Sequence, residues 1–254
     1  MRLLIAAIAS LALLLPAGGN AQTEPEKPVI DLNDYDAMRK LLVSAVREHI
    51  QATARQTGVS ALDDDLLDAI AKTPRHEFVP PPLRKLAYLD IPLPLGHKQN
   101  ISQPFLIALM TQLVRVRKQD VVFETGTGAG YQAAILTHLA DRVYSVEVVE
   151  PLAKQAKERL ARLGYDGVEV KRSDGYYGWP EKGPFDVIIV KEAVHHIPPP
   201  LLNQLKPGGR MVAPVGPLGQ SQTLKLITKG QNGQVEQRDI LPVRFAPLQG
   251  GERI

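Results

Sequence analysis

The segment Val121–Tyr131, which reads VVFETGTGAGY, constrains the fold more than any other part of the chain. It begins with a short apolar run, Val121–Glu124, that predicts a buried strand ending on a carboxylate. Glycines at positions 126, 128 and 130 allow positive φ and let a ligand approach the backbone closely. A helix that starts at Tyr131 would point unpaired N–H groups and its positive dipole end at the same place. The segment therefore predicts a ligand crevice at the carboxyl end of a strand.

A second acidic strand end indicates which ligand this crevice binds. The predicted strand Arg142–Glu147 places Glu147 about 20 residues after the glycines, where a carboxylate can hold the two hydroxyls of a ribose. No Lys-Ser or Lys-Thr pair follows the glycines, so the turn is not a phosphate-binding loop of the nucleotide triphosphatase type. An adenosyl ligand without phosphates, such as S-adenosylmethionine, fits these residues better than NAD or ATP.

Strands and helices alternate from the glycine turn onward, which predicts a doubly wound, mainly parallel sheet of the Rossmann-like α/β class. Three helical segments are predicted before the glycine turn, two of them in the N-terminal prelude. A terminal antiparallel hairpin is predicted after the parallel strands, with its own turn at Gln231–Gly233. The predicted strands are 121–124, 143–147, 168–171, 187–191, 210–214, 223–228 and 235–243, and the predicted helices between them are 131–139, 151–163 and 199–205. Residues 93–104 are predicted to be a loop, followed by a helix over 105–114.

The N-terminus has the pattern of a secretory signal peptide. Arg2 precedes the apolar run Leu3–Leu15, Pro16 interrupts it, and Gly19–Asn20–Ala21 offers small residues for cleavage. The run is shorter than the ~20 residues that span a bilayer, so export is favoured over the alternative, an uncleaved anchor. We expect a signal peptide over 1–21, a linker over 22–32 and one domain over 33–254 that includes a helical prelude, 33–90. The expected location is the periplasm, or the cytoplasm if the signal is not used.

Composition excludes several kinds of chemistry. The chain has no cysteine, which removes disulfides, thiolate metal sites and cysteine nucleophiles. Its net charge of +3 is small, so no nucleic-acid partner is predicted. Asp63–Asp65 could suggest a metal site, but acidic residues are also favoured in a first helical turn. His195–His196 lacks the usual spacing of metal ligands, and no metal site is predicted.

Further candidate site residues follow later strands of the predicted sheet. Asp174–Gly175 comes after the third strand, where the aspartate could bind the adenine amine and the glycine could allow close stacking. Lys191–Glu192 ends the fourth strand and should border the acceptor. We expect these two side chains to compensate each other's charge, unless the alternation of strand side chains points them apart.

From about Leu66 to its C-terminus the chain resembles the protein-L-isoaspartate O-methyltransferases, which have a class I methyltransferase fold. The resemblance is carried by the segments Thr73–Pro80 (TPRHEFVP), Leu93–Pro104 (LPLGHKQNISQP), Glu124–Gln132 (ETGTGAGYQ), Asp174–Pro180 (DGYYGWP), Leu205–Arg210 (LKPGGR) and Leu241–Leu248 (LPVRFAPL). The Ile-Ser-x-Pro loop together with Asp-Gly-Tyr-x-Gly-Trp is highly specific for this family. The resemblance implies methyl transfer from S-adenosylmethionine to the α-carboxyl of L-isoaspartyl residues in damaged proteins. The methyl ester then cyclises to a succinimide.

The resemblance also implies roles for individual residues. Ser102 matches the family's active-site serine, and we expect it to orient the acceptor carboxylate by donating a hydrogen bond. The predicted cofactor-binding residues are Gln99, Asn100, Ser102, Glu124, Gly126, Thr127, Gly128, Glu147, Asp174 and Gly175. The candidate substrate contacts are His97, Lys191 and Glu192. The last two depart from the family pattern, which has small neutral residues after this strand.

Three functions are therefore kept open. The first is isoaspartyl repair by a monomeric enzyme that acts on damaged proteins and does not insert into membranes. The second is methylation of a different carboxylate, selected by Lys191 and Glu192. The third is an exported binding protein that has kept the fold without turnover, although the intact glycine turn, Glu147, Asp174 and Ser102 argue against it.

Overall fold

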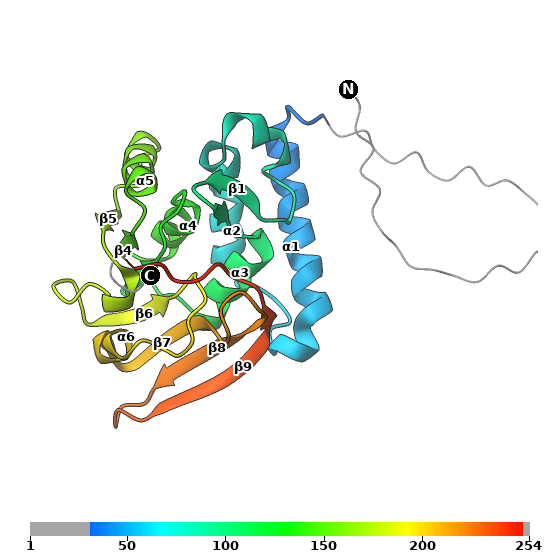
Figure 1. Cartoon of the computed structure of the whole chain (residues 1–254). Helices are drawn as coiled ribbons and strands as arrows, with labels where there is room; N and C mark the ends of the chain where they lie inside the picture. Colours follow the sequence, from blue (N-terminus) through cyan, green and yellow to red (C-terminus); the bar gives the residue numbers. More distant parts are fainter. Residues whose placement is uncertain (1–30, 251–254) are drawn as a thin grey trace, which may run out of the picture. The chain divides into compact units, whose positions relative to one another are not determined.

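A seven-stranded mixed sheet lies at the centre of the computed structural model, which describes residues 31–250 (Figure 1). Its strands follow the order β5-β4-β3-β6-β7-β8-β9, parallel from β5 to β7 and antiparallel from β7 to β9. The strands are β3 (Val121–Thr125), β4 (Arg142–Glu147), β5 (Val168–Arg172), β6 (Phe185–Ile189), β7 (Leu205–Val215), β8 (Gln222–Lys229) and β9 (Val235–Val243). The order reverses between β3 and β6, and a crevice is expected at that point. The predicted fold class is confirmed.

Both faces of the sheet are buried, as a parallel sheet requires. Successive residues of β3 serve different cores: Val122 packs with the first four helices, and Phe123 packs with the opposite layer. Phe123 there stacks on Phe185 of the neighbouring strand, with ring centroids 4.9 Å apart. The alternation fixes Glu124 on the same face as Val122, which matters for the site below.

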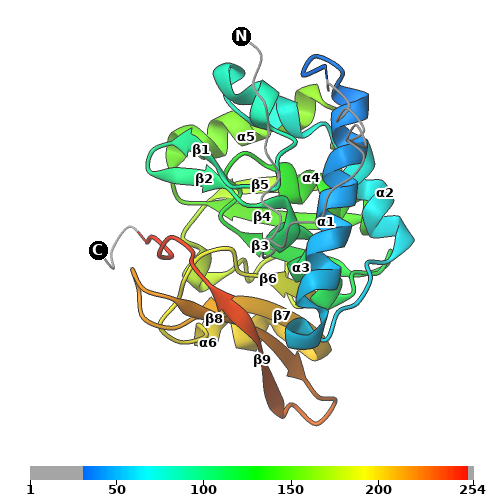
Figure 2. The same ribbon diagram turned by 90° about the vertical axis from the view of Figure 1, so that its right-hand side faces the viewer.

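The helices cover these faces from both sides of the sheet. They are α1 (Tyr35–Thr57), α2 (Asp64–Lys72), α3 (Pro104–Val114), α4 (Tyr131–Leu139), α5 (Glu150–Arg162) and α6 (Pro199–Gln204). Asp34 caps α1 by accepting hydrogen bonds from the N–H groups of Asp36 and Ala37, and Gly58 ends it at a φ of 72°. Helix α1 packs outside α3 (Figure 2). As predicted from the helix dipole, the acidic residues Asp64 and Asp65 lie in the first turn of α2.

The segment predicted as the loop 93–104 contains a small hairpin instead. Strands β1 (Leu93–Gly96) and β2 (Gln99–Ile101) pair antiparallel. Their turn holds Gly96, His97 and Lys98 at positive φ, with values of 87°, 51° and 58°. The strands are too short to show a period, so the sequence pattern could not reveal them.

The predicted signal peptide and most of the linker lie outside the described residues. Within residues 31–250 no helix is long and apolar enough to span a membrane.

Candidate active site

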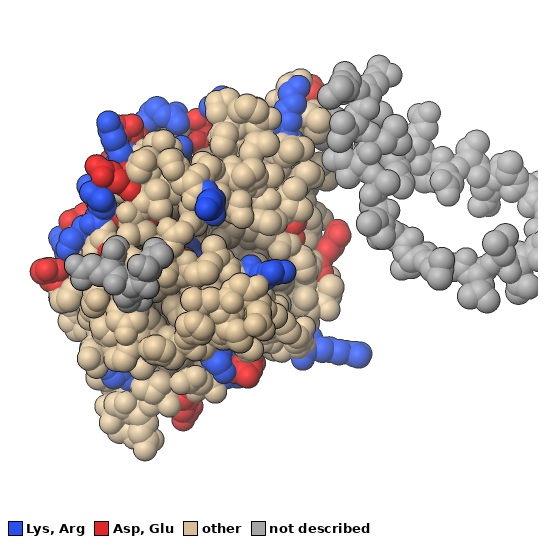
Figure 3. Space-filling view, viewed as in Figure 1, with Lys and Arg blue, Asp and Glu red and all other residues tan. Residues whose placement is uncertain are grey.

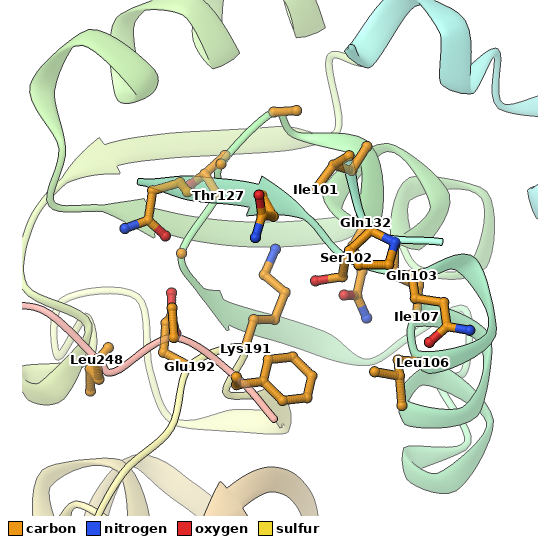
Figure 4. A pocket seen from close by; sticks show the side chains of 18 of the residues that line it. Ile101, Ser102, Gln103, Leu106, Ile107, Thr127, Gln132, Lys191, Glu192 and Leu248 are labelled. Carbon is orange, nitrogen blue, oxygen red and sulfur yellow. The ribbon is translucent and has the colours of Figure 1, made fainter. Parts of the chain in front are cut away.

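A cavity of about 510 Å³ opens at the carboxyl ends of β3 and β4 (Figure 4). Its wall comes from the glycine turn after β3, the β2–α3 loop around Ser102, the loop after β6 and the C-terminal segment 241–249. That segment is attached to the loop after β6, because Ala193 donates to Ala246 O at 2.8 Å and Leu248 donates back to Ala193 O at 2.9 Å. Four segments distant in sequence therefore meet around one space.

Glu147 is fixed at the end of β4 by the main chain. Its Oε2 accepts from Gly128 N at 2.8 Å, and its Oε1 accepts from Val149 N at 2.9 Å. Each carboxylate oxygen has a second lone pair, which leaves capacity for one more donor apiece. A carboxylate held this way in the cavity wall fits the two hydroxyls of a ribose.

Neighbouring side chains leave no space for a Cβ at two glycines of the cavity. A Cβ on Gly175 would lie 2.8 Å from Thr125 Cγ2, and one on Gly126 would lie 1.6 Å from Glu192 Oε1. Asp174, beside Gly175, uses its side chain to accept from Tyr176 N at 2.9 Å. The close approach of Glu192 and Thr125 accounts for these two glycines, and the carboxylate of Glu147 remains the group that fits an adenosyl ribose.

The Ser102 loop is clamped by two charged residues from the N-terminal half. The buried Arg75 donates to Ser102 O at 2.8 Å while its guanidinium lies 4.8 Å from the ring centroid of Tyr131. Burial lowers the pKa of Arg75 to about 10. Because Tyr131 opens α4 directly after the glycine turn, Arg75 joins the Ser102 loop to the turn.

Asp90 forms the second clamp. It accepts from Phe105 N at 2.7 Å, in the first turn of α3, and from Gln103 Nε2 at 3.3 Å. It also accepts from His49 Nδ1 at 2.9 Å. His49 lines the cavity, and its ring stacks on Phe105 with centroids 3.7 Å apart. A carboxylate partner places the imidazole proton on Nδ1 in the neutral ring.

The charged residues after β6 have different partners from those we predicted. Lys191 forms an ion pair with Glu124, with 2.9 Å between Nζ and Oε2; the Glu124 side chain is fully buried and that of Lys191 is partly buried. Glu124 also accepts from Ser145 Oγ at 2.8 Å. Glu192 accepts from Thr125 Oγ1 at 2.5 Å. The expected Lys191–Glu192 pair is therefore wrong: β6 ends at Ile189, and Glu124 faces Lys191 from the next strand.

Glu192 is a carboxyl in an unusual environment. Burial raises its pKa to about 7, against the opposing effects of the Thr125 hydrogen bond and the positive charge of Lys191. Glu147 and Glu124 add to the increase. Burial therefore favours the neutral form of this carboxyl more strongly than in an exposed glutamate.

Comparison with known proteins decides the class of this site. The model of the protein-L-isoaspartate(D-aspartate) O-methyltransferase family matches residues 45–253. The chain belongs to this family. It is 48% identical to protein-L-isoaspartate O-methyltransferase 2 of Syntrophobacter fumaroxidans over 95% of both chains. It is 51% identical to the enzyme of the same name from a Polaromonas species, over 84% of this chain and 99% of that one.

Solved structures agree with the family assignment. A protein-L-isoaspartate O-methyltransferase structure has a TM-score of 0.72 and 31% identity, covering 84% of this chain and 66% of that one. A Plasmodium falciparum structure solved in complex with S-adenosyl-L-homocysteine shares the fold, with a TM-score of 0.68 at 21% identity and coverage of 85% and 98%. The predicted enzyme class, an S-adenosylmethionine-dependent protein-L-isoaspartate O-methyltransferase, and its cofactor are confirmed by the family.

The structure brings together most of the site residues predicted from sequence. Those that line the cavity are Gln99, Asn100, Ser102, Gly126, Thr127, Gly128, Glu147, Gly175, Lys191 and Glu192. Three others lie elsewhere. Glu124 is fully buried behind Lys191, Asp174 caps its own turn, and His97 is exposed at the β1–β2 turn. His195–His196 is an exposed loop, and residues 31–250 hold no cluster of three or more His, Asp or Glu side chains suited to a metal.

Sequence reasoning missed two groups of residues around the site. His49 lines the cavity and Arg75 holds the Ser102 loop, and both come from the N-terminal prelude. The sequence pattern predicted only amphipathic helices and their ends in that region. Segment 241–249 forms a wall of the cavity, although it was used only to recognise the family. The family segment Thr73–Pro80 contains Arg75, so this segment was the available signal for that residue.

Proposed function

We propose that this chain methylates the α-carboxyl of L-isoaspartyl residues in the cavity between the glycine turn and Ser102. The observation that carries the proposal is that residues for both partners line one cavity: Glu147 and the glycines after β3 and β4, and Ser102 in the β2–α3 loop. Figure 4 shows Thr127 of the glycine turn and Ser102 at this cavity. The family membership makes isoaspartyl-containing proteins the substrate class.

The reaction asks little of the protein besides orientation. A carboxylate is already ionised at neutral pH and needs no general base. When bound, S-adenosylmethionine supplies an electrophilic methyl group on a sulfonium. Glu147, Gly128 and Gly175 hold the adenosyl side, and Ser102 donates a hydrogen bond that turns the acceptor carboxylate toward the methyl.

The geometry around Ser102 agrees with an orienting role. A nucleophilic serine requires a paired base. Within residues 31–250 no histidine donates to or accepts from the Ser102 hydroxyl, and His97, the candidate nearest in sequence, is exposed outside the cavity. The Ser102 main chain, in contrast, is held firmly by Arg75.

A second candidate function is methylation of another carboxylate. Lys191 and Glu192 favour it, because they replace small neutral residues where the acceptor enters. Tritiated methyl transfer to an isoaspartyl peptide and to a panel of other acids separates the two. Preference for the isoaspartyl peptide supports repair, and transfer only to another acid would overturn it.

We also propose that the protein acts after export, as a monomer, on protein substrates. The support is the sequence pattern of residues 1–21 and the modest net charge of +3. On the face seen in Figure 3 basic and acidic side chains are mixed, and neither sign forms a continuous patch of the kind that nucleic acid would need.

A further inference from the structure

Glu192 lies in the cavity wall beside the glycine turn. Its side chain points to the turn (Figure 4), and Oε1 occupies the space that a Cβ on Gly126 would fill. Its other oxygen, Oε2, accepts from Thr125 Oγ1 at 2.5 Å. The carboxyl is therefore held in place from both sides, inside the wall of the reaction cavity.

Within residues 31–250 no cation forms an ion pair with Glu192, although the positive charge of the adjacent Lys191 opposes the rise in its pKa. Lys191 is paired with Glu124, and the other carboxylate facing this space is Glu147. An ionised Glu192 would add a negative charge to a site that must admit a negative acceptor. Desolvation and the two neighbouring carboxylates both favour its neutral form.

The hydrogen bonds indicate where the proton of the neutral form resides. Thr125 Oγ1 accepts from Lys191 N at 3.2 Å, so its own hydrogen is available for Glu192 Oε2. Oε2 is thus an acceptor, and the carboxyl proton belongs on Oε1, beside the glycine turn.

We propose that Glu192 is an acceptor-binding residue whose neutral carboxyl donates a hydrogen bond from Oε1 to the substrate carboxylate and whose ionised form rejects that substrate. The proposal rests on the proposed function. Ser102 and Glu192 then hold the acceptor from opposite walls of the cavity. Small neutral residues at this position could not make acceptor binding depend on pH in this way.

The first test is the pH profile of kcat/KM for an isoaspartyl peptide. With a Glu192 pKa of about 7, the wild type should lose about tenfold between about pH 6 and pH 8, a range in which the acceptor stays ionised. Glu192→Gln keeps a donor that cannot ionise, so it should match the wild type near pH 6 and lose this decline. Glu192→Ala should have a low kcat/KM that does not change over this pH range. Glu236 is exposed on β9, and Glu236→Gln should have the pH profile of the wild type.

The second test follows protonation through thermal unfolding, independently of activity. A carboxyl whose pKa is raised in the folded state destabilises the fold progressively as pH rises from its unfolded pKa to its folded pKa. The stability advantage of Glu192→Gln over the wild type should therefore grow between about pH 5 and pH 7 and then level off. A stability advantage of Glu192→Gln that does not change with pH would overturn the claim that Glu192 is neutral in the folded protein.

The two levels of the proposal fail differently. If no isoaspartyl methylation occurs at any pH, the proposed function fails and the acceptor-binding role fails with it. If methylation occurs but Glu192→Gln keeps the wild-type decline, the proposed function stands and the role of Glu192 is wrong.

Discussion

At the scale of single residues, each functional residue of the cavity is held by a different partner. Glu147 is held by main-chain N–H groups, the buried Glu124 by Lys191, and Ser102 through its carbonyl by Arg75. The Ser102 hydroxyl is thus placed by its backbone and not by a neighbouring base. This arrangement suits a reaction that depends on the alignment of its reactants.

Replacing Ser102 by Ala should slow methylation with little change in cofactor affinity, because the hydroxyl addresses the acceptor. Because only one orienting hydrogen bond is lost, the methylation rate should fall by ~10²-fold at most. Steady-state rates and calorimetry of S-adenosylhomocysteine binding measure the two effects, with Ser44→Ala on the surface of α1 as control. Complete inactivity with a methylated serine in the wild type would show that Ser102 attacks.

Replacing Glu147 by Ala should weaken binding of the cofactor or its demethylated product by ~1–3 kcal/mol, the usual range for charged hydrogen bonds. Calorimetry on the folded variant measures this directly. Glu158→Ala, exposed on α5, is the matched control and should bind normally. Unchanged affinity in Glu147→Ala would remove this carboxylate from the binding site.

At the scale of elements, the Ser102 loop depends on residues far away in the sequence. Asp90 ties this loop to α1 through His49 and to α3 through Phe105 N. Replacing Asp90 by Ala should cost about 1–3 kcal/mol of unfolding free energy, because it leaves Phe105 N in the first turn of α3 and Nδ1 of His49 without their acceptor. Denaturant unfolding measures it, and Asp65→Ala in the first turn of α2 should change stability by less than ~0.5 kcal/mol. Equal effects of both changes would contradict the clamp.

The elements differ in how far sequence could predict them. The strand, glycine turn and helix around Gly126 followed from apolar runs and breakers, because local chemistry decides them. The β1–β2 hairpin did not, since strands this short carry no period. The ion pair between Lys191 and Glu124 joins β3 to the loop after β6, and only the sheet order β3-β6 brings the two residues together. Arg75 and His49 were missed because their contacts, with Ser102 and Asp90 respectively, also join residues that are distant in sequence.

At the scale of the whole molecule, the β2–α3 loop, the loops after the parallel strands and the C-terminal segment 241–249 meet around the cavity, and His49 of the N-terminal prelude also lines it. The N-terminus carries a separate prediction. Protein recovered from the native cell envelope should have the intact mass of a chain that begins at Gln22, because residues 1–21 have the pattern of a cleaved signal. A mass that includes Met1–Leu15 would support an uncleaved anchor instead.

The most direct test of the account is a matched pair of peptides that differ only in one linkage, L-isoaspartyl against L-aspartyl. The mature protein should transfer the methyl group of S-adenosylmethionine to the isoaspartyl peptide, and the product should go on to release methanol and form a succinimide. The aspartyl twin should remain unmethylated. Equal transfer to both peptides, or transfer to neither, would contradict the claim that this cavity recognises isoaspartyl residues.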